Sequence, residues 1–443
     1  MVVDCMKKKE LILPIGLGII FSLIYYKLPL NYFVLFLLGT MGVVLILHDI
    51  RLGIFAAVIL LPFMPDMLNL LYMIFMVGVY LYKALFKDIN PLTKEPMDLP
   101  ILVFALLILI STITSIDPLG SFRDLAIHLT AMGFMFVLVN SIKTKKDFNI
   151  LITFLVIAAT LVALYGLYQY KVGVDMEDKW VDAANNPDVK TRVFSVFGNP
   201  NILAEYLIMI IPISISLFWY SKKLHKKAIF LGISLILMLA LVLTLSRGGW
   251  IGFAFGILIF VILIEKKLLL SIIPLVLGGL YFLPQSILNR ISSIGNLRDS
   301  SNAYRLKMWG ITLDIIRDNW LVGVGFGYIP FKHTFETYIR TMPVYHSHNT
   351  YLQITGEMGI LGLIVFLGLI FIIYKYSIKR LIKGEDRYIR TMAAGVLAGL
   401  AALLGHGAVE SVLYLPRIII TFWTLVALLL ALMRISGKPE EIG

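Results

Sequence analysis

Two histidines in this chain lie where a polar segment passes into an apolar run. Residues 345–351 read Tyr-His-Ser-His-Asn-Thr-Tyr and contain His346 and His348. An imidazole titrates close to neutral pH, so it can accept a proton from a hydroxyl group that is about to attack a substrate. The segment therefore predicts general-base chemistry.

Two other functions of these histidines are less well supported by the sequence. A metal site would need a third ligand, but no cysteine is near and the carboxylate of Glu357 is nine positions beyond His348. A Ser-His hydrolase would need a spatial triad, whereas Ser347 directly precedes His348 and no Gly-x-Ser-x-Gly surrounds it. We therefore predict neither a bound metal nor a cofactor.

Arg247 lies in the segment 244–250, Thr-Leu-Ser-Arg-Gly-Gly-Trp, which joins two apolar runs. A charge so close to hydrocarbon is costly and normally faces a partner or a wet cavity. The alternative is that Arg247 extends to lipid headgroups at a tight helix hairpin. The two glycines favour the first interpretation, because they permit close approach of the backbone to a ligand.

Arg305 lies in the segment 304–309, Tyr-Arg-Leu-Lys-Met-Trp, within a long polar stretch. If Arg305 and Arg247 face one cavity on the same side of a membrane, their planar guanidinium groups could bind a pyrophosphate in a bidentate manner. Alternatively, the charged pair of this segment forms a solvated helix face.

Two weaker patterns also occur. Glycines at 323, 325 and 327 resemble a dinucleotide-binding loop, but no strand precedes them, which favours a plain turn. His406 and Glu410 are one helical turn apart near the end of a late apolar run. They could orient a site or form hydrogen bonds within a helix bundle.

The composition predicts an all-α integral membrane protein. Of the 443 residues, 59% are hydrophobic and 15% are charged, and the mean hydropathy is +0.89. These values exclude intrinsic disorder, a collagen-like fibre and a disulfide-rich scaffold, and the one cysteine, Cys5, excludes an intramolecular disulfide. We expect a bundle of about 12–14 transmembrane helices, of which 52–65 is short enough to be re-entrant.

The net charge of +12 is best explained by topology. With the N-terminus in the cytoplasm, 24 of the 39 Lys and Arg residues lie at cytoplasmic ends, against eight in short external segments. This bias predicts a multi-pass protein of the cytoplasmic (inner) membrane with both termini cytoplasmic. No basic and aromatic nucleic-acid motif is present, and the first apolar run, 11–26, lacks a cleavage site and is expected to be a retained anchor.

Long polar segments divide the chain. We expect N-terminal transmembrane helices over 1–170, central helices over 171–283, a large extracytoplasmic loop over 284–350 and C-terminal transmembrane helices over 351–443. The near-helical spacing of apolar residues over 304–316 predicts a helix within this loop. Loops of this length are usually functional.

Four motifs follow one another between residues 192 and 369. Residues 199–201 read Asn-Pro-Asn and open an apolar run, and residues 245–249 read Leu-Ser-Arg-Gly-Gly. Arg305 is followed by Trp309 and then by 318–325, which read Asp-Asn-Trp-Leu-Val-Gly-Val-Gly. All three motifs are predicted to lie at the extracytoplasmic side.

The fourth motif is His348-Asn349, nine residues, and then Gly359-Ile-Leu-Gly362. Together the four motifs resemble the O-antigen ligase and O-antigen polymerase superfamily, which are polytopic membrane glycosyltransferases of the GT-C type. The fourth matches the ligase signature except that Leu363 stands where the family has Gly, Thr or Tyr. This departure bears on the choice between ligase and polymerase.

The resemblance implies transfer of a glycan from an undecaprenyl-pyrophosphate carrier to an acceptor hydroxyl at the outer face of the membrane. By position, His348 would be the general base, and Arg247 and Arg305 would bind the leaving pyrophosphate. His346 is the local alternative base. The other residues expected to bind substrate are Arg192, Asn199, Asn201, Tyr304, His346, Asn349, His406 and Glu410.

Charge on a departing diphosphate must be neutralised by a metal or by protein cations. The chain supplies arginines and has no acidic pair in its first external loop, where residues 27–31 read Lys-Leu-Pro-Leu-Asn. A metal-independent, inverting displacement is therefore expected. The acceptor could be lipid A core, a growing repeat-unit polymer, a surface-layer or pilin protein, or a wall polymer, so polymerase and protein O-oligosaccharyltransferase remain alternatives.

Two different classes would also place many helices in a membrane. A lipid-linked glycan flippase or transporter usually shows repeat symmetry and broken helices near the midplane, whereas the polar residues here gather in external segments. A membrane scaffold without catalytic activity would not explain three cationic motifs on one side. The enzyme interpretation is therefore preferred.

The charge bias predicts that residues 284–350 are external and that the segment around Lys383 is cytoplasmic. Single cysteines introduced at Asn296 and Lys383 should differ in their reaction with a membrane-impermeant thiol reagent applied to intact cells. Only the cysteine at 296 should react from outside. Labelling of the cysteine at 383 from outside would contradict this topology.

Overall fold

The computed structural model describes residues 15–16, 18–86, 96–174, 191–271, 274, 278, 281, 284–296, 299–342 and 346–437. Cys5 and parts of the region 171–283, where the central helices are expected, lie outside these residues. The described residues form helices, turns and irregular segments and contain no strands, so the all-α prediction is confirmed.

The chain forms two compact units. The first, residues 1–53, holds an apolar helix, Gly18–Lys27, and α2, Leu30–His48. α3, Ile50–Leu60, begins at its end. The second unit, residues 54–443, holds the remaining helices. They are α4 (Asp66–Phe86), α5 (Asp98–Ile113), α6 (Pro118–Ser141), α7 (Lys145–Val172), α8 (Pro200–Tyr220), α9 (Leu224–Leu243), α10 (Arg247–Ile264), α12 (Gln285–Ser292), α13 (Ser300–Asp318), α14 (Tyr328–Tyr338), α15 (Thr350–Ser377), α16 (Arg387–His406) and α17 (Pro416–Ile435).

Among the described residues, ten helices are long and apolar enough to cross a membrane, so this is a multi-pass membrane protein. Three shorter apolar helices accompany them, and one of these is α3, with 11 residues, in the run that was expected to be short. Apolar side chains on the outer helices remain exposed, as expected for helices that face lipid, while α8, α16 and α17 are the most buried spans.

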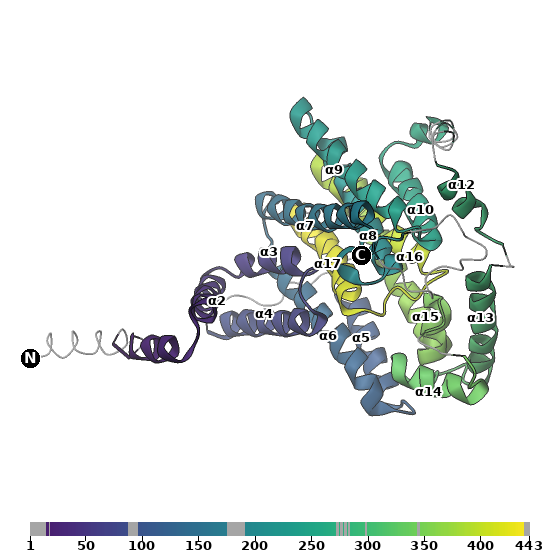
Figure 1. Cartoon of the computed structure of the whole chain (residues 1–443), viewed down its shortest axis with the longest axis horizontal. Helices are drawn as coiled ribbons and strands as arrows, with labels where there is room; N and C mark the ends of the chain where they lie inside the picture. Colours follow the sequence, from purple (N-terminus) through teal and green to yellow (C-terminus); the bar gives the residue numbers. More distant parts are fainter. Residues whose placement is uncertain are drawn as a thin grey trace, which may run out of the picture. The chain divides into compact units, whose positions relative to one another are not determined.

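The centre of the second unit is the contact of α16 with α8 and α10, which lie side by side in Figure 1. α16 carries small residues along its length, and close helix approach in membranes depends on such residues. A Cβ atom on Gly252 of α10 would lie only 2.5 Å from the carbonyl oxygen of Ala402, and one on Gly256 only 2.7 Å from that of Ala398. These glycines therefore set the spacing of α10 and α16.

The paired glycines after Arg247 belong to the same contact. A Cβ on Gly248 would lie 2.6 Å from the ring of His406, and a Cβ on Gly249 would lie 2.7 Å from the Cβ of Ala204. The expectation that they make room for a ligand is therefore wrong, because α16 and α8 fill the space beside them.

The long polar segment is folded, and the helix expected over 304–316 is confirmed as part of α13. Its inward face and α14 share an apolar cluster that includes Met308, Ile315, Phe331 and Phe335. α13 also packs against α15 (Figure 1). The segment thus forms a layer that is fixed to the membrane helices.

α15 breaks at Gly359, which has a φ of 67° and a ψ of −171°. The break leaves carbonyl groups without partners in the helix, and amides of the loop that contains Gly323, Gly325 and Gly327 donate to these carbonyls instead. The amides of Val324 and Gly325 donate to the carbonyls of Gly356 and Glu357, at 3.0 and 2.9 Å. The loop is therefore structural, in agreement with the expected plain turn.

Replacing Gly359 by alanine should destabilise the protein. The new Cβ would be strained at this φ and would press on the carbonyl of Leu321, so the free energy of unfolding should fall by about 2–4 kcal/mol. A Cβ on Gly368 of the same helix would meet no neighbouring atom within 4 Å, so Gly368→Ala is the matched control. Thermal denaturation in detergent measures both, and equal melting temperatures would contradict the prediction.

Candidate active site

The site is organised around the contact between His348 and Glu410. Glu410 lies in the turn after α16, and its Oε1 is 2.6 Å from Nδ1 of His348. The carboxylate is 5% exposed and the imidazole 25% exposed. A carboxylate at Nδ1 fixes the proton there and orients the ring, which leaves Nε2 as the proton acceptor.

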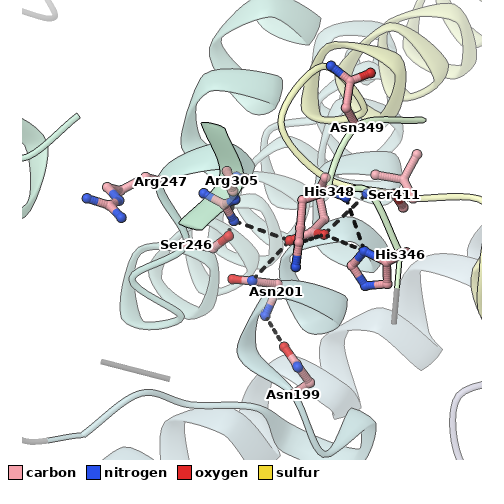
Figure 2. Close-up of polar contacts among 12 residues, drawn as sticks. Asn199, Asn201, Ser246, Arg247, Arg305, His346, His348, Asn349 and Ser411 are labelled. Carbon is pink, nitrogen blue, oxygen red and sulfur yellow. Dashed lines mark hydrogen bonds and ion pairs between the residues drawn. The ribbon is translucent and has the colours of Figure 1, made fainter. Parts of the chain in front are cut away.

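Glu410 also accepts hydrogen bonds from other segments. Nη2 of Arg305 donates to its Oε2 at 3.3 Å, and Nδ2 of Asn201 donates to the same oxygen at 3.4 Å. Figure 2 shows the side chains of Arg305, Asn201, His346 and His348 turned toward one another. Burial by itself would raise the pKa of Glu410, but the interactions with His348, His346 and Arg305 lower this pKa by more than burial raises it. The pKa therefore lies well below its usual value, and the group is ionised.

The backbone of His348 is strained. Its φ is 53°, a region that non-glycine residues rarely adopt. Its N–H donates to Nδ1 of His346 at 3.3 Å, and its carbonyl accepts from Nε1 of Trp309 at 3.3 Å. The ring of Tyr304 stands edge to face with its imidazole, with centroids 6.0 Å apart. α13, which carries both aromatic residues, therefore positions His348.

His346 is less suited to be the base. Its Nδ1 accepts the backbone hydrogen bond of His348, so the ring proton is on Nε2. Burial, together with His348, lowers the pKa of His346 to about 4. The ring is therefore neutral near pH 7 and offers a donor, and its role is to support the conformation of His348.

His346, His348 and Glu410 could together hold a metal ion. Their donor atoms all lie within 4.8 Å of one another, and two imidazoles with one carboxylate suit several transition metals. Sequence reasoning considered Glu357 as the carboxylate, but Glu357 accepts from Gln353 and from the amide of Gly327 instead. Arg305, bound to the same carboxylate, supplies a positive charge that opposes a cation there.

Arg247 forms a buried ion pair with Asp299. Its Nη1 and Nη2 donate to the two carboxylate oxygens at 3.1 and 3.0 Å, and Nη1 also donates to the carbonyl of Ser293 at 3.1 Å. The two side chains are 6% and 1% exposed. The alternative that Arg247 extends to lipid headgroups is therefore wrong.

Asp299 connects this pair to the loop layer. Its Oδ1 also accepts from the amides of Ser301 and Asn302, at 3.1 and 3.3 Å, and so caps α13. In Figure 2, Arg247 lies to one side of the residues that surround His348, with Arg305 between. Asp299 thus fixes the start of the helix that carries Arg305.

Two further arginines complete a cationic cluster with Arg247 and Arg305. Arg192 donates from Nε to the carbonyl of Thr244 at 2.8 Å, and from Nη2 to Oδ1 of Asn201 at 3.0 Å. Arg290 donates from Nε to the carbonyl of Leu245 at 3.3 Å. Burial lowers the pKa of Arg192 and of Arg290, and the positive charges of Arg247 and Arg305 lower both further.

Sequence reasoning missed Arg290 and Asp299. Asp299 did carry a local signal, because Asp-Ser-Ser-Asn before a helical pattern is typical of an N-cap, but that signal predicts a helix start and not a partner for Arg247. Nothing in the local sequence distinguishes Arg290 from a solvated arginine.

Three of the predicted residues have structural contacts. Oδ1 of Asn199 accepts from the amide of Asn201 at 2.8 Å and caps α8. Oδ1 of Asn349 caps α15, and its Nδ2 donates to the carbonyl of Ala408 at 2.9 Å. His406 packs on Gly248 in the contact of α16 with α10. A direct role of these three in binding substrate stays a prediction.

Part of the chain is similar to known proteins. Residues 232–367 match the family described as O-Antigen ligase, a range that includes Arg247, Arg305 and His348. A Rickettsia typhi protein provisionally named a polysaccharide ligase is 28% identical over 215 residues. The match covers 44% of this chain and 49% of that relative, so about half of each is aligned. The expected resemblance to the O-antigen ligase family is therefore confirmed over residues 232–367, which include three of the four motifs, while the Asn-Pro-Asn motif at 199–201 lies outside this range.

Proposed function

We propose that the chain is a glycosyltransferase that moves a glycan from undecaprenyl pyrophosphate to an acceptor hydroxyl. The observation that carries the proposal is the oriented pair of His348 and Glu410 beside a cluster of four arginines. A base and an anion-binding cluster are what displacement of a diphosphate by a hydroxyl requires.

His348 would act as the general base. Nε2 accepts the proton of the acceptor hydroxyl while the oxygen attacks the anomeric carbon. The bond from that carbon to the phosphate oxygen breaks, and its electron pair leaves with the pyrophosphate. Glu410, ionised and bound to Nδ1, stabilises the imidazolium that forms. A single displacement of this kind inverts the configuration at the anomeric carbon.

The arginine cluster would stabilise the leaving group. Arg305 has one contact of 3.3 Å with Glu410, so other donors of its guanidinium can face a diphosphate. Both terminal nitrogens of Arg247 are bound to Asp299, so Arg247 would bind the diphosphate only when Asp299 is displaced. Arg192 and Arg290 add positive charge, and no step of this mechanism requires a metal.

We place this site at the outer face of the cytoplasmic membrane, with both termini in the cytoplasm, because of the charge bias of the short loops. Ligase, polymerase and protein O-oligosaccharyltransferase differ only in the acceptor that brings the hydroxyl. Lipid-linked glycan, membrane lipids and one of these acceptors are the proposed partners. An assay that offers each acceptor in turn distinguishes the three.

His348→Ala should lower glycan transfer by about 10²-fold or more, because the attacking hydroxyl loses its proton acceptor. Expression and carrier-lipid binding should be nearly unchanged. Purified protein with lipid-pyrophosphate-linked glycan and acceptor, assayed over pH 5 to 9 with EDTA, measures transfer.

His346→Ala is the matched control and should cost much less than His348→Ala. Near-wild-type turnover of the His348 variant would contradict the base mechanism. Loss of wild-type turnover in EDTA, restored by zinc or magnesium, would instead assign His346, His348 and Glu410 to a metal site.

Arg305→Lys and Arg247→Lys should each lower transfer by about one to three orders of magnitude, because lysine keeps the charge but loses the planar fork.

Asp299→Asn separates two roles of Arg247. If the diphosphate replaces Asp299, this variant should bind the lipid carrier at least as well as the wild type. If Arg247 only positions α13, Asp299→Asn should lose activity as Arg247→Lys does. Full activity of both arginine variants would refute diphosphate binding by this cluster.

A further inference from the structure

A cavity with a volume of about 570 Å³ lies where α7 and α16 begin and α8 ends. Basic and aromatic side chains dominate its lining. The lining residues are Lys145, Lys146, Asn149, Tyr220, Lys222, Asp386, Arg387 and Tyr388.

The cavity and the transferase site lie at opposite ends of the same helices. α8 has Asn201 at one end and Tyr220 at the other, and α16 runs from Arg387 to His406, four residues before Glu410. At 1.5 Å per residue, helices of this length span about 30 Å, close to the thickness of the hydrocarbon layer. The cavity therefore lies at the headgroup level of the membrane face opposite His348.

Positive charge exceeds negative charge in this cavity. Four of the lining side chains are cationic, and Asp386 is the one acidic residue among them. Asp386 forms an ion pair with Lys145. It also accepts hydrogen bonds from the amides of Tyr388 and Ile389 and so caps α16. Because α7 and α16 both begin here, their N-terminal ends add partial positive charge.

The aromatic residues form one wall of the cavity. The rings of Tyr220 and Tyr388 meet edge to face with centroids 5.1 Å apart, and the hydroxyl of Tyr388 donates to Oδ1 of Asn149 at 3.4 Å. Tyrosines are common at the level of lipid headgroups, where the ring lies beside apolar groups and the hydroxyl is hydrated. The wall is therefore suited to the region between a headgroup and its acyl chains.

We propose that this cavity binds the phosphate group of an anionic phospholipid. Clustered basic side chains between membrane helices at the headgroup level attract such groups. After Lys145 has paired with Asp386, the charges of Lys146, Lys222 and Arg387 are left, and of these Lys146 and Lys222 are exposed. A soluble phosphate ester carries the same anionic chemistry, and the experiment below distinguishes the two sources.

The test compares two double variants of the full-length protein. Lys146→Gln with Lys222→Gln removes two cations of the cavity. Lys226→Gln with Lys227→Gln removes two cations from the nearby first turn of α9, outside the cavity lining, and is the matched control. Melting temperatures in phosphatidylcholine bicelles establish that both variants fold.

Native mass spectrometry would then measure binding of phosphatidylglycerol, and separately of glycerol phosphate in phosphatidylcholine bicelles. We expect phosphatidylglycerol to bind about tenfold or more weakly to the cavity variant, because two basic residues that attract the anionic headgroup have been removed. The control should change less than about twofold. Cavity-dependent binding of glycerol phosphate would support the site but assign it to a soluble ester. Equal losses in both variants, or no binding of either probe, would overturn the proposal.

Discussion

The site depends on the interactions of one buried group, the carboxylate of Glu410. It binds His348 before α15, Arg305 of α13 and Asn201 of α8, so three segments far apart in sequence meet at one group. An ionised carboxylate removed from water is costly unless it is paired and hydrogen-bonded. The loop layer and the membrane helices must therefore both be in place before the charge of Glu410 is compensated.

The pair of Arg247 and Asp299 extends this constraint to α10. Because Asp299 also caps α13, the position of Arg305 depends on a contact made by another arginine. Arg247 binds Asp299 and Arg305 binds Glu410, and Arg192 and Arg290 add two further positive charges to this region. The excess of positive charge gives a doubly charged leaving group a favourable place to bind.

The sequence predicts what depends on local periodicity and composition. Apolar runs gave the membrane helices, and the spacing over 304–316 gave α13. Long-range pairing could not be predicted, because Arg247 and Asp299 are 52 positions apart and nothing in the local sequence of either residue indicates the other as its partner. The paired glycines were misinterpreted for the same reason: a missing side chain shows that something approaches closely, but not whether it is a ligand or α16.

The backbone shows that the site is held in place by tertiary contacts. Among the described residues, the non-glycine residues with positive φ are Ser195, Leu245 and His348, and all three adjoin the site segments. Each is restrained from outside its own segment: Gln169 accepts from the amide of Ser195, Arg290 donates to the carbonyl of Leu245, and Trp309 to that of His348. Such conformations cost about 1–3 kcal/mol each and persist only where surrounding contacts impose them. The contacts that Arg290 of α12 and Trp309 of α13 make therefore hold the backbone of Leu245, beside the arginine cluster, and that of His348 in these conformations.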